Sequence, residues 1–317
     1  MGIGISGGGS LGLAFETNVG VYASPTKYHP ILSESLEFMP GLMYRRPIRQ
    51  SIDQIGVVPG NVSVSGTVSA EALDDILVYY LYAMRMQIVR TGTSPNWVYT
   101  CTPTSLSVFP TRTLSLTVVR NSQTFGYTGC VVSKLTLGIQ NDILQADMDI
   151  IGLNEAIQNQ PSPTWNTTVP IGPGQWNVQV PTGTQIFDMD TFSFSIDEAG
   201  TANYRLKNTG ANAGRGAQFI GFGERTVQMT ASRDFIDRTD YNAFQATLPQ
   251  SITILGTANS SVYNSIQFLM GNATKSAMQI VMGAQGDIVR STLTYDTVID
   301  GNGNACQLAV NTQETIS

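Results

Sequence analysis

Charge is scarce in this sequence. Lys, Arg, Asp and Glu together make up 13% of its 317 residues, against roughly 25% in an average soluble domain. Hydrophobic residues make up 42%, which is enough for a core. Disordered chains have a lower hydrophobic content, so this composition argues against a disordered chain. Free monomers usually depend on surface charge for solubility. We therefore expect copies of the same chain to cover much of its surface.

Basic residues are the scarcer kind of charge. The chain has 17 Lys and Arg against 23 Asp and Glu, a net charge of −6. Tight binding of nucleic acid needs Lys or Arg at several phosphates. This balance therefore predicts that the chain does not bind nucleic acid tightly.

Histidine and cysteine are also rare. His29 is the single histidine, which excludes Ser-His-Asp triads and sites with several histidines, and the prolines around it predict a loop residue without a chemical role. The three cysteines, Cys101, Cys130 and Cys306, form no C-x-x-C pair. We interpret them as small buried hydrophobic residues, in keeping with folding in a reducing cytoplasm.

Targeting segments and cofactor motifs are weak or missing. The apolar run at residues 77–89 is too short for a membrane span and contains Arg85, and the first residues lack the basic start of a signal peptide. The glycine pattern at residues 2–7 follows no predicted strand. Residues 300–311 lack the glycine and glutamate of a calcium loop. We expect no cofactor, no metal and no membrane.

Most of the chain alternates apolar and polar residues as a half-buried strand does. This pattern covers residues 61–69, 114–118, 131–137 and 143–151. Residues 70–84 instead have apolar residues three to four apart, which predicts a helix with Ser69 as its N-cap. Glu71, Asp74 and Asp75 lie in its first turns. They suit the positive end of the helix dipole better than a catalytic role.

The second part of the sequence repeats the first. Residues 138–143 (GIQNDI) return as 283–288 (GAQGDI), and without a gap Leu135 and Leu137 then match Ile280 and Met282. Residues 67–69 (TVS) return as 230–232 (TAS), each before a predicted helix, the second at residues 233–244. The first of these repeats recurs after 145 residues and the second after 163. Because these spacings differ by 18 residues, the first copy should contain an insertion, which we place at residues 91–110.

A tandem duplication divides the chain as follows. We predict an N-terminal arm at residues 1–32, a first copy at 33–156, a linker at 157–184 and a second copy at 185–317. The linker is rich in proline. Each copy opens with a strand, at residues 35–38 and 192–196, followed by a long irregular segment at 40–60 and 197–223. Loops of this length inside compact domains are uncommon and usually functional or disordered.

This layout resembles the tail tube (major tail) proteins of long-tailed, non-contractile-tailed bacteriophages, in their tandem-duplicated form. The stretches that carry the resemblance are 15–22 (FETNVGVY), 33–38 (SESLEF), 62–68 (VSVSGTV) and 125–137 (FGYTGCVVSKLTL). The resemblance covers residues 15–155 and, more weakly, 185–317. It implies a mainly β fold (α+β): two tail-tube domains, each a β-sandwich of antiparallel sheets with one flanking helix and a long loop.

The resemblance also implies a function. Chains of this type stack as rings whose inner β-barrel forms a channel for genome delivery into the host, and a duplicated chain implies three chains per ring. The implied partners are further copies of the chain, the tail terminator, the tape measure and the baseplate or distal tail proteins. DNA is implied in transit only, without specific binding. The implied location is the virion tail, after synthesis in the host bacterial cytoplasm. No catalysis is implied.

Two groups of residues become candidate sites. For the wall of the channel we expect the polar face of residues 143–151 and its counterpart: Gln145, Asp147, Asp149 and Asp296. Arg290, on the same predicted face, would need an acidic neighbour. The long segments should meet the adjacent ring through their basic residues, because Arg pairs well with carboxylates: Arg45, Arg46, Arg49, Arg205, Lys207 and Arg215.

Two alternatives stay open at this point. A carbohydrate-binding or glycosidase-like β-sandwich, for instance a phage adhesion module, would use Asp147 with Asp149, Asp188 with Asp190, and the tryptophans Trp97, Trp165 and Trp176. A neck or inner tube protein of a contractile tail would share the fold and is not separable by sequence alone.

Overall fold

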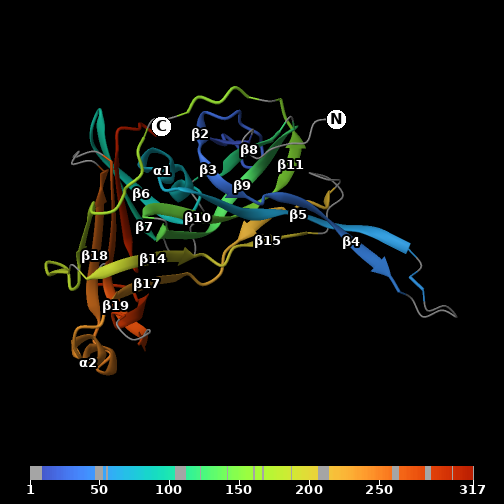
Figure 1. Ribbon diagram of the computed structural model, residues 1–317. Helices are drawn as coiled ribbons and strands as arrows, with labels where there is room; N and C mark the ends of the chain where they lie inside the picture. Colours follow the sequence, from blue (N-terminus) through green and yellow to red (C-terminus); the bar gives the residue numbers. More distant parts are fainter. Residues whose placement is uncertain are drawn as a thin grey trace.

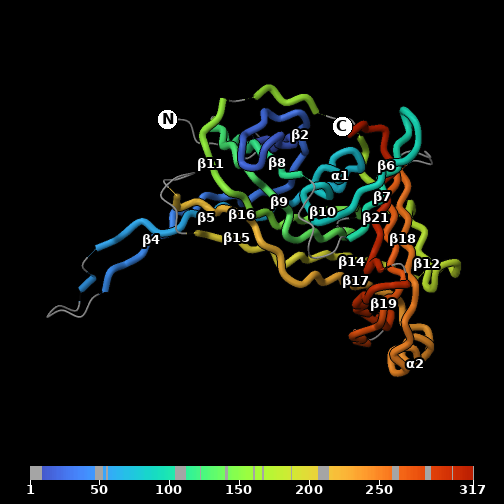
Figure 2. The backbone as a smooth tube through the Cα atoms, turned by 180° about the vertical axis from the view of Figure 1, so that it is seen from behind, coloured from blue at the N-terminus to red at the C-terminus, as the bar shows by residue number. Residues whose placement is uncertain are grey.

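The computed structural model describes residues 9–46, 53–54, 56–103, 112–121, 123–140, 142–159, 161–165, 168–186, 188–205, 214–258, 264–282, 287–301 and 303–316. Within these ranges the chain is mostly β-strand, and its strands pair in antiparallel fashion (Figures 1 and 2). The mainly β fold expected from the alternating pattern is thereby confirmed. Below, the first half means residues 33–156 and the second half residues 185–317.

The elements up to the end of the first half are β1 (Ser10–Phe15), β2 (Lys27–His29), β3 (Ile31–Glu34), β4 (Glu37–Arg45), β5 (Gly56–Glu71), α1 (Asp74–Tyr82), β6 (Met86–Thr93), β7 (Asn96–Pro103), β8 (Leu114–Arg120), β9 (Gln123–Gln140), β10 (Ile143–Gly152) and β11 (Asn154–Ile157). Those that follow are β12 (Trp176–Gln179), β13 (Gln185–Ile186), β14 (Met189–Asp197), β15 (Thr201–Asn203), β16 (Phe219–Gly221), β17 (Thr226–Asp234), α2 (Thr239–Gln245), β18 (Gln250–Thr257), β19 (Ser265–Val281), β20 (Arg290–Thr297) and β21 (Gln307–Thr312).

One sheet, called the long sheet below, runs through both halves. Its strands lie side by side in the order β4, β5, β10, β9, β14, β17, β20 and β19, and β3 precedes β4 along the same edge of β5. In the first half β10 lies between β5 and β9, and in the second half β20 lies between β17 and β19. The halves meet where β9 pairs with β14, with Leu137 opposite Phe194.

Two side sheets complete the halves, because β9 and β19 each pass from one sheet into another. The first side sheet has the order β2, β1, β8, β9, β11. The second has the order β13, β12, β18, β19, β21, β7, β6. Gly129, at φ 62°, is where β9 turns between its two sheets, a backbone conformation that glycine adopts at little cost. Hairpin β6–β7 comes from the first half but completes the second side sheet.

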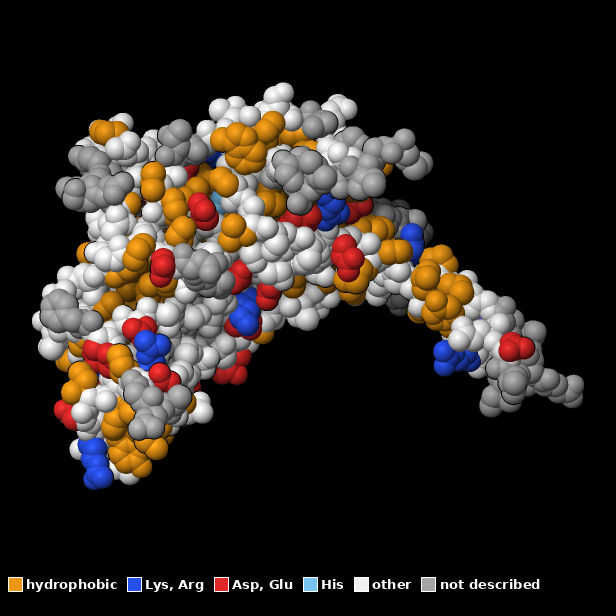
Figure 3. All heavy atoms as spheres, in the orientation of Figure 1, with side chains coloured by type: hydrophobic (Ala, Val, Ile, Leu, Met, Phe, Trp, Pro, Cys, Tyr) orange, Lys and Arg blue, Asp and Glu red, His pale blue; other side chains and the backbone are white. Residues whose placement is uncertain are grey.

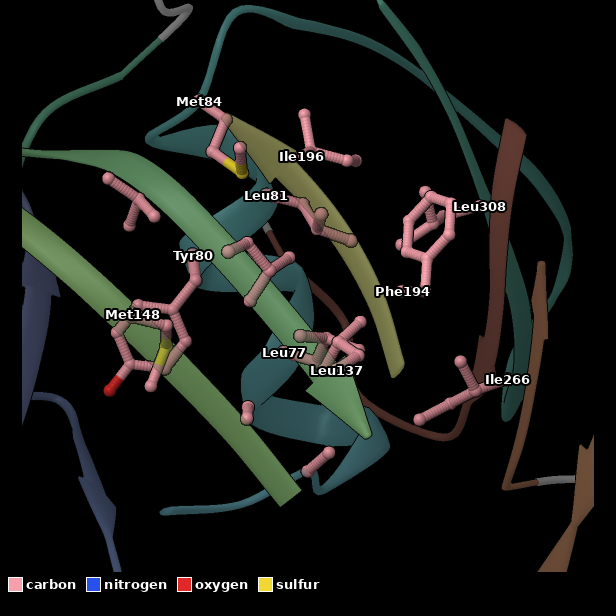
Figure 4. Packing of buried hydrophobic residues seen from close by; sticks show 14 of the residues in the cluster. Leu77, Tyr80, Leu81, Met84, Leu137, Met148, Phe194, Ile196, Ile266 and Leu308 are labelled. Carbon is pink, nitrogen blue, oxygen red and sulfur yellow. The ribbon is translucent and has the colours of Figure 1, made fainter. Parts of the chain in front are cut away.

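The core lies between these sheets around α1. Residues Asp74 to Leu81 of α1 are all buried, and Figure 4 shows Tyr80, Leu77 and Leu81 packed toward Met148 of β10 and Leu137 of β9. Phe15 of β1 stacks on Tyr79 with ring centroids 4.7 Å apart. Burying each large apolar side chain contributes about 1.5–3 kcal/mol, so α1 is held mainly by the sheets around it.

The start of α1 differs from the prediction. Ser69 is not an N-cap: it lies in β5 opposite Asp147, and the cap position is Leu73. The strand continues to Glu71 because Val68 and Ala70 still alternate with polar neighbours and are fully buried. In the second half, β17 likewise runs to Asp234, and α2 starts only at Thr239.

The long segments also differ from the prediction. The described residues at both ends of 40–60 are not an irregular loop. Residues 40–45 of β4 pair with residues 56–62 of β5, and this pair of strands, called the arm below, projects from the rest of the chain (Figures 1 and 2). Residues 197–223 include the small β15–β16 sheet. The segment around the expected insertion includes the β6–β7 hairpin, whose Gly92 has φ 99°.

Candidate assembly surfaces

The polar face of the long sheet carries the carboxylates expected at the channel wall. Asp147 and Asp149 alternate along β10 with buried Met148 and so lie on the face opposite the core. Ser69 Oγ donates to Asp147 Oδ1 at 2.5 Å, and Thr67 Oγ1 donates to Asp149 Oδ1 at 2.8 Å. These hydrogen bonds hold both side chains against β5.

The matching face of the second half is less charged. Ser232 and Thr230 of β17 face Thr292 and Thr294 of β20, where the first half has Asp147 and Asp149. Asp296 is exposed at the end of β20 and accepts a hydrogen bond from Gln228 Nε2 at 2.8 Å. Gln145 is half-buried on β10. The face is therefore rich in hydroxyl groups, with its carboxylates unevenly divided between the halves.

The cations of this face have acidic neighbours. Lys134 of β9 lies opposite Asp149 on one side and Asp197 on the other. Arg290 forms an ion pair with Asp190, with 3.1 Å between Nε and Oδ2. The acidic neighbour that the sequence analysis required for Arg290 is thus present.

Two edges of the long sheet have no strand partner within the described ranges. One is the outer edge of β3 and β4, which pair only with β5 on their other side. The second is the outer edge of the last part of β19, after the residues that belong to the side sheet. Strand β20 pairs with the other edge of this part. Apolar side chains are exposed near both edges: Met39 and Leu42 on β4, and Ile280, Val281 and Met282 at β19. Unpaired edges of this kind attract further strands.

The arm carries an apolar surface of its own. Five large side chains on it are 39–57% exposed: Leu42, Met43, Tyr44, Val57 and Val58. Gly41 is needed at its base, because a Cβ there would lie 2.2 Å from the carbonyl oxygen of Asn61. Arg45 and Arg46 are exposed near its outer end, whereas Arg49 lies outside the described residues. Hydrophobic side chains gather along this projection in Figure 3.

The second long segment lies against the first half of its own chain. Arg215 accepts through its carbonyl a hydrogen bond from Val62 N at 3.0 Å, and its Nη1 donates to Gly60 O at 3.4 Å. Arg205 is exposed, with its guanidinium over the ring of Phe219, 5.2 Å from the centroid. Lys207 lies outside the described residues.

A buried ion cluster joins the two halves. Glu198, which is fully buried, pairs with Arg85 and, at 2.7 Å, with Arg225. Arg85 Nη2 also donates to Gly223 O at 3.1 Å, and its guanidinium lies over the ring of Phe222. Sequence reasoning missed this cluster. The one available signal was an arginine inside the apolar run at residues 77–89.

His29 is a buried strand residue rather than a loop residue. It lies in β2, where its Nδ1 is 3.0 Å from Tyr80 Oη and its Nε2 is 2.9 Å from the carbonyl oxygen of Glu71. Burial lowers the pKa of His29 to about 4. Asp74 at the start of α1 shows the opposite shift: burial raises its pKa to about 6.

The cysteines are buried and free, as expected from their spacing. Burial raises the pKa of the Cys306 thiol to about 12 and also raises the pKa of Cys101 and Cys130. Thiols with raised pKa values are poor nucleophiles at neutral pH. Engineered cysteines would therefore meet little competition from them.

The residues of the carbohydrate-binding alternative are brought together only in part. Trp176 and Asp190 line one pocket. Asp188 pairs with Arg233 at 2.7 Å and Asp190 pairs with Arg290. The three tryptophans have different neighbours. The guanidinium of Arg90 lies over the ring of Trp97 in β7, and the ring of Trp176 packs on that of Phe192. The ring centroids of Trp165 and Tyr28 are 6.3 Å apart.

In the part of the chain that the structure describes, no helix is long and apolar enough to cross a membrane.

A family model described as phage tail tube protein matches residues 8–302. None of the curated proteins matches the chain.

Proposed function

The chain belongs to the phage tail tube protein family, and from this premise we propose that three copies close into a ring and that stacked rings enclose the channel for genome delivery into the host. The chain is a structural protein of the virion tail. In this proposal the two halves are tandem copies of one tail-tube domain, divided as in the sequence analysis. The tube is made after synthesis in the host cytoplasm and needs no cofactor.

The observation that carries this proposal is the pairing of β9 with β14. It joins the two halves edge to edge and, among the described residues, leaves one unpaired edge at each end of the long sheet. A head-to-tail contact that repeats the same rotation closes a ring and removes both edges. The six halves of three chains then complete one barrel.

The internal pairing also predicts the register between chains. Ser195 of β14 lies opposite Thr136 of β9, and Thr136 lies opposite Asp147 of β10. In the other half, Gln279 of β19 takes the place of Thr136, because it lies opposite Thr292. Glu37 of β4 takes the place of Ser195 of β14. Strand β5 separates Glu37 from β10, and strand β17 separates Ser195 from β20, the strand that matches β10, at the same level of the sheet. We therefore expect Glu37 of one chain opposite Gln279 of the next.

We assign the polar face of the long sheet to the channel. The core and α1 occupy its other face, so this is the face left for the interior of the barrel. Gln145, Asp147, Asp149 and Asp296 then line the wall. Phosphates gain little affinity from such a wall, because few Lys or Arg are available to displace counterions, and with a Debye length of about 8 Å carboxylates repel DNA only at close range.

We assign the arm to contact with the adjacent ring. Its exposed apolar side chains and Arg45 and Arg46 support this, because surfaces of this kind are normally buried in an assembly. The proposal extends to Arg49, which lies outside the described residues. For the second segment, with Arg205, Lys207 and Arg215, stacking stays a proposal beside the contacts that Arg215 makes within its own chain. The tail terminator, tape measure and baseplate or distal tail proteins would meet the same ring at the ends and inside of the tube.

Electron microscopy of the purified full-length chain tests the proposal. We expect rings or hollow tubes, and native mass spectrometry of an isolated ring should give three chains. The variant Glu37→Cys with Gln279→Cys should form disulfides between chains, because paired strands bring Cα atoms to bridging distance. Glu37→Cys with Gln267→Cys is the matched control, since Gln267 pairs with Ala309 in the second side sheet. A monodisperse monomer, or six full-length chains per ring, would contradict the proposal.

A further inference from the structure

The two helices differ sharply in exposure. Residues Asp74 to Leu81 of α1 are buried, whereas no residue of α2 is buried. Around α2, Ile236 is 77%, Leu248 is 55% and Tyr241 is 38% exposed. In Figure 3, hydrophobic side chains gather at the end of the molecule that carries α2. Apolar groups clustered in this way usually lie in a contact.

Part of what buries α1 comes from the other half of the chain. α1 contacts β21, the last strand of the second half, and Asp74 at its start is hydrogen-bonded to Thr312 at the end of β21. β1 and β2 cover another side, through Phe15 and His29. The junction between the halves is thus a contact between the helix of one half and a side-sheet strand of the next.

The strand that matches β21 in the first half is β11. Ile157 of β11 lies opposite Phe125 in β9, and Leu308 of β21 lies opposite Phe268 in β19. Leu308 is fully buried, with β7 paired along its outer side, whereas Ile157 is 76% exposed. Ala156 beside it is exposed too. Within the described ranges, β11 has no strand on its outer edge.

The helix and the side-sheet strand that cover each other where the two halves meet, α1 and β21, are therefore buried, whereas their counterparts α2 and β11 are exposed. We propose that α2 of one chain packs against β11 of the next chain in the ring, as α1 packs against β21 within a chain. The occupant of each surface is a second copy of this chain, and the inference rests on the ring proposed above. A contact of this head-to-tail kind uses two different surfaces and closes only by repetition around a ring.

The contact between chains must differ from the internal one in one respect. Hairpin β6–β7 follows α1 and covers the outer edge of β21, but only four residues separate α2 from β18. No counterpart of the hairpin exists there. The edge of β11 is then covered by side chains from around α2, namely Ile236, Tyr241 and Leu248, rather than by an added strand.

A photo-crosslinker tests this contact. Benzoylphenylalanine would replace Tyr241 in the full-length chain, and tubes would be assembled from a mixture of isotopically heavy and light chains, so that crosslinks between chains carry mixed labels. We expect mixed-label crosslinks from position 241 to residues 154–159 in tubes and none in dissociated chains. The same group in place of Trp165, which is 46% exposed in the linker, is the matched control and should give no crosslink to β11.

The outcomes separate this inference from the ring itself. If tubes form but position 241 crosslinks only within its own chain or to another segment, the α2–β11 contact is wrong and the ring proposal stands. If neither rings nor tubes form, the ring proposal fails and the inference fails with it. Leu248→Asp gives a second measure: it should raise the protein concentration needed for tube formation at least tenfold while leaving the chain folded, and an unchanged concentration would overturn the contact.

Discussion

Leu137 and Phe194 lie opposite each other on β9 and β14, at the seam where the two halves become one sheet. Both are buried, and Phe194 also packs on Phe268 with ring centroids 5.3 Å apart. The seam is therefore part of the core, although its two strands come from different halves.

The first prediction concerns this seam. Phe194→Ala should lower the free energy of unfolding by about 3–5 kcal/mol, because it leaves a cavity among side chains of both halves. Urea denaturation followed by fluorescence measures the change. Phe219→Ala, at a position 37% exposed, is the control and should cost less than half as much; equal losses would mean that the seam is not tightly packed.

The second prediction concerns the buried ion cluster. Glu198→Gln should destabilise the chain by about 3–5 kcal/mol, since it leaves the charges of Arg85 and Arg225 without their buried partner. Thermal and urea unfolding measure the loss. Glu314→Gln removes the carboxylate of the partly exposed Lys27–Glu314 pair and should cost about 1 kcal/mol or less. Comparable losses in the two variants would contradict this account of Glu198.

The third prediction concerns acid. Burial lowers the pKa of His29 from 6.5 to about 4, so between these values the unfolded chain binds the proton that the folded chain excludes. The contribution of neutral His29 is complete above pH 6.5 and falls by roughly 3 kcal/mol as the pH drops to 4. His29→Gln should lack this decline.

The measurement is the difference in unfolding free energy between the two proteins from pH 7 to pH 4. Asp74 acts in the opposite direction, because its raised pKa of about 6 lets the folded chain bind a proton first. Both proteins contain Asp74, so its effect cancels in the difference. A difference that stays constant with pH would show that His29 does not titrate in this way.

The fourth prediction concerns the polar face. Asp147→Lys with Asp149→Lys should leave tubes intact but slow or block genome ejection, because each added cation gives DNA phosphates a partner. Asp147→Asn with Asp149→Asn is the control: it keeps acceptors for Ser69 and Thr67 and should eject at close to the native rate. Ejection unchanged by the lysines would place these carboxylates outside the channel.

The fifth prediction concerns the arm. Deleting residues 44–50 should leave a folded chain that forms rings but no tubes, since the body and both edges of the long sheet remain. Circular dichroism checks the fold, and electron microscopy counts rings and tubes. Tubes of normal length from the deletion variant would rule out the arm as the stacking element.

The sequence predicted best what depends on local alternation. The period-two pattern from Ile143 onward correctly placed Leu144, Met148 and Ile150 in the core and Asp147 and Asp149 on the other face. It did so because a strand puts successive side chains on opposite faces whatever its partners are. The helix after β5 was placed correctly too, apart from its first turn.

Features that depend on distant partners were not predictable in the same way. The gap-free match of Leu137 with Met282 is wrong, because Leu137 is fully buried while Met282 is 81% exposed. The cause is the turn: β9 and β10 are paired up to Gln140 and Ile143, but β19 and β20 only up to Val281 and Arg290. The turn between β19 and β20 is longer than the turn between β9 and β10. The residues of β19 that correspond to β9 therefore lie two positions away from the gap-free match.

The buried cluster of Arg85, Glu198 and Arg225 shows the same limit. Its members come from three places in the sequence, and only Arg85, inside an apolar run, differs from the pattern of a surface charge. Only the fold, which brings the end of β14 under the residues after α1, makes them neighbours. The arm was missed for a related reason, since Gly41, Pro59 and Gly60 have the pattern of a loop although the strands continue through them.

The β6–β7 hairpin has a consequence for how the chain is made. β7 is synthesised early, yet its partner β21 is the last strand, with Cys101 opposite Leu308. Tyr99, fully buried in the finished protein, binds Glu314 O and Ile316 N through its hydroxyl group. While the ribosome is still translating the second half, this hairpin has no place to dock and its apolar side chains stay accessible to chaperones. The fold of the first half is therefore complete only after residues 307–312 have been synthesised, and a ribosome that stops before residue 307 releases a chain in which neither half is finished.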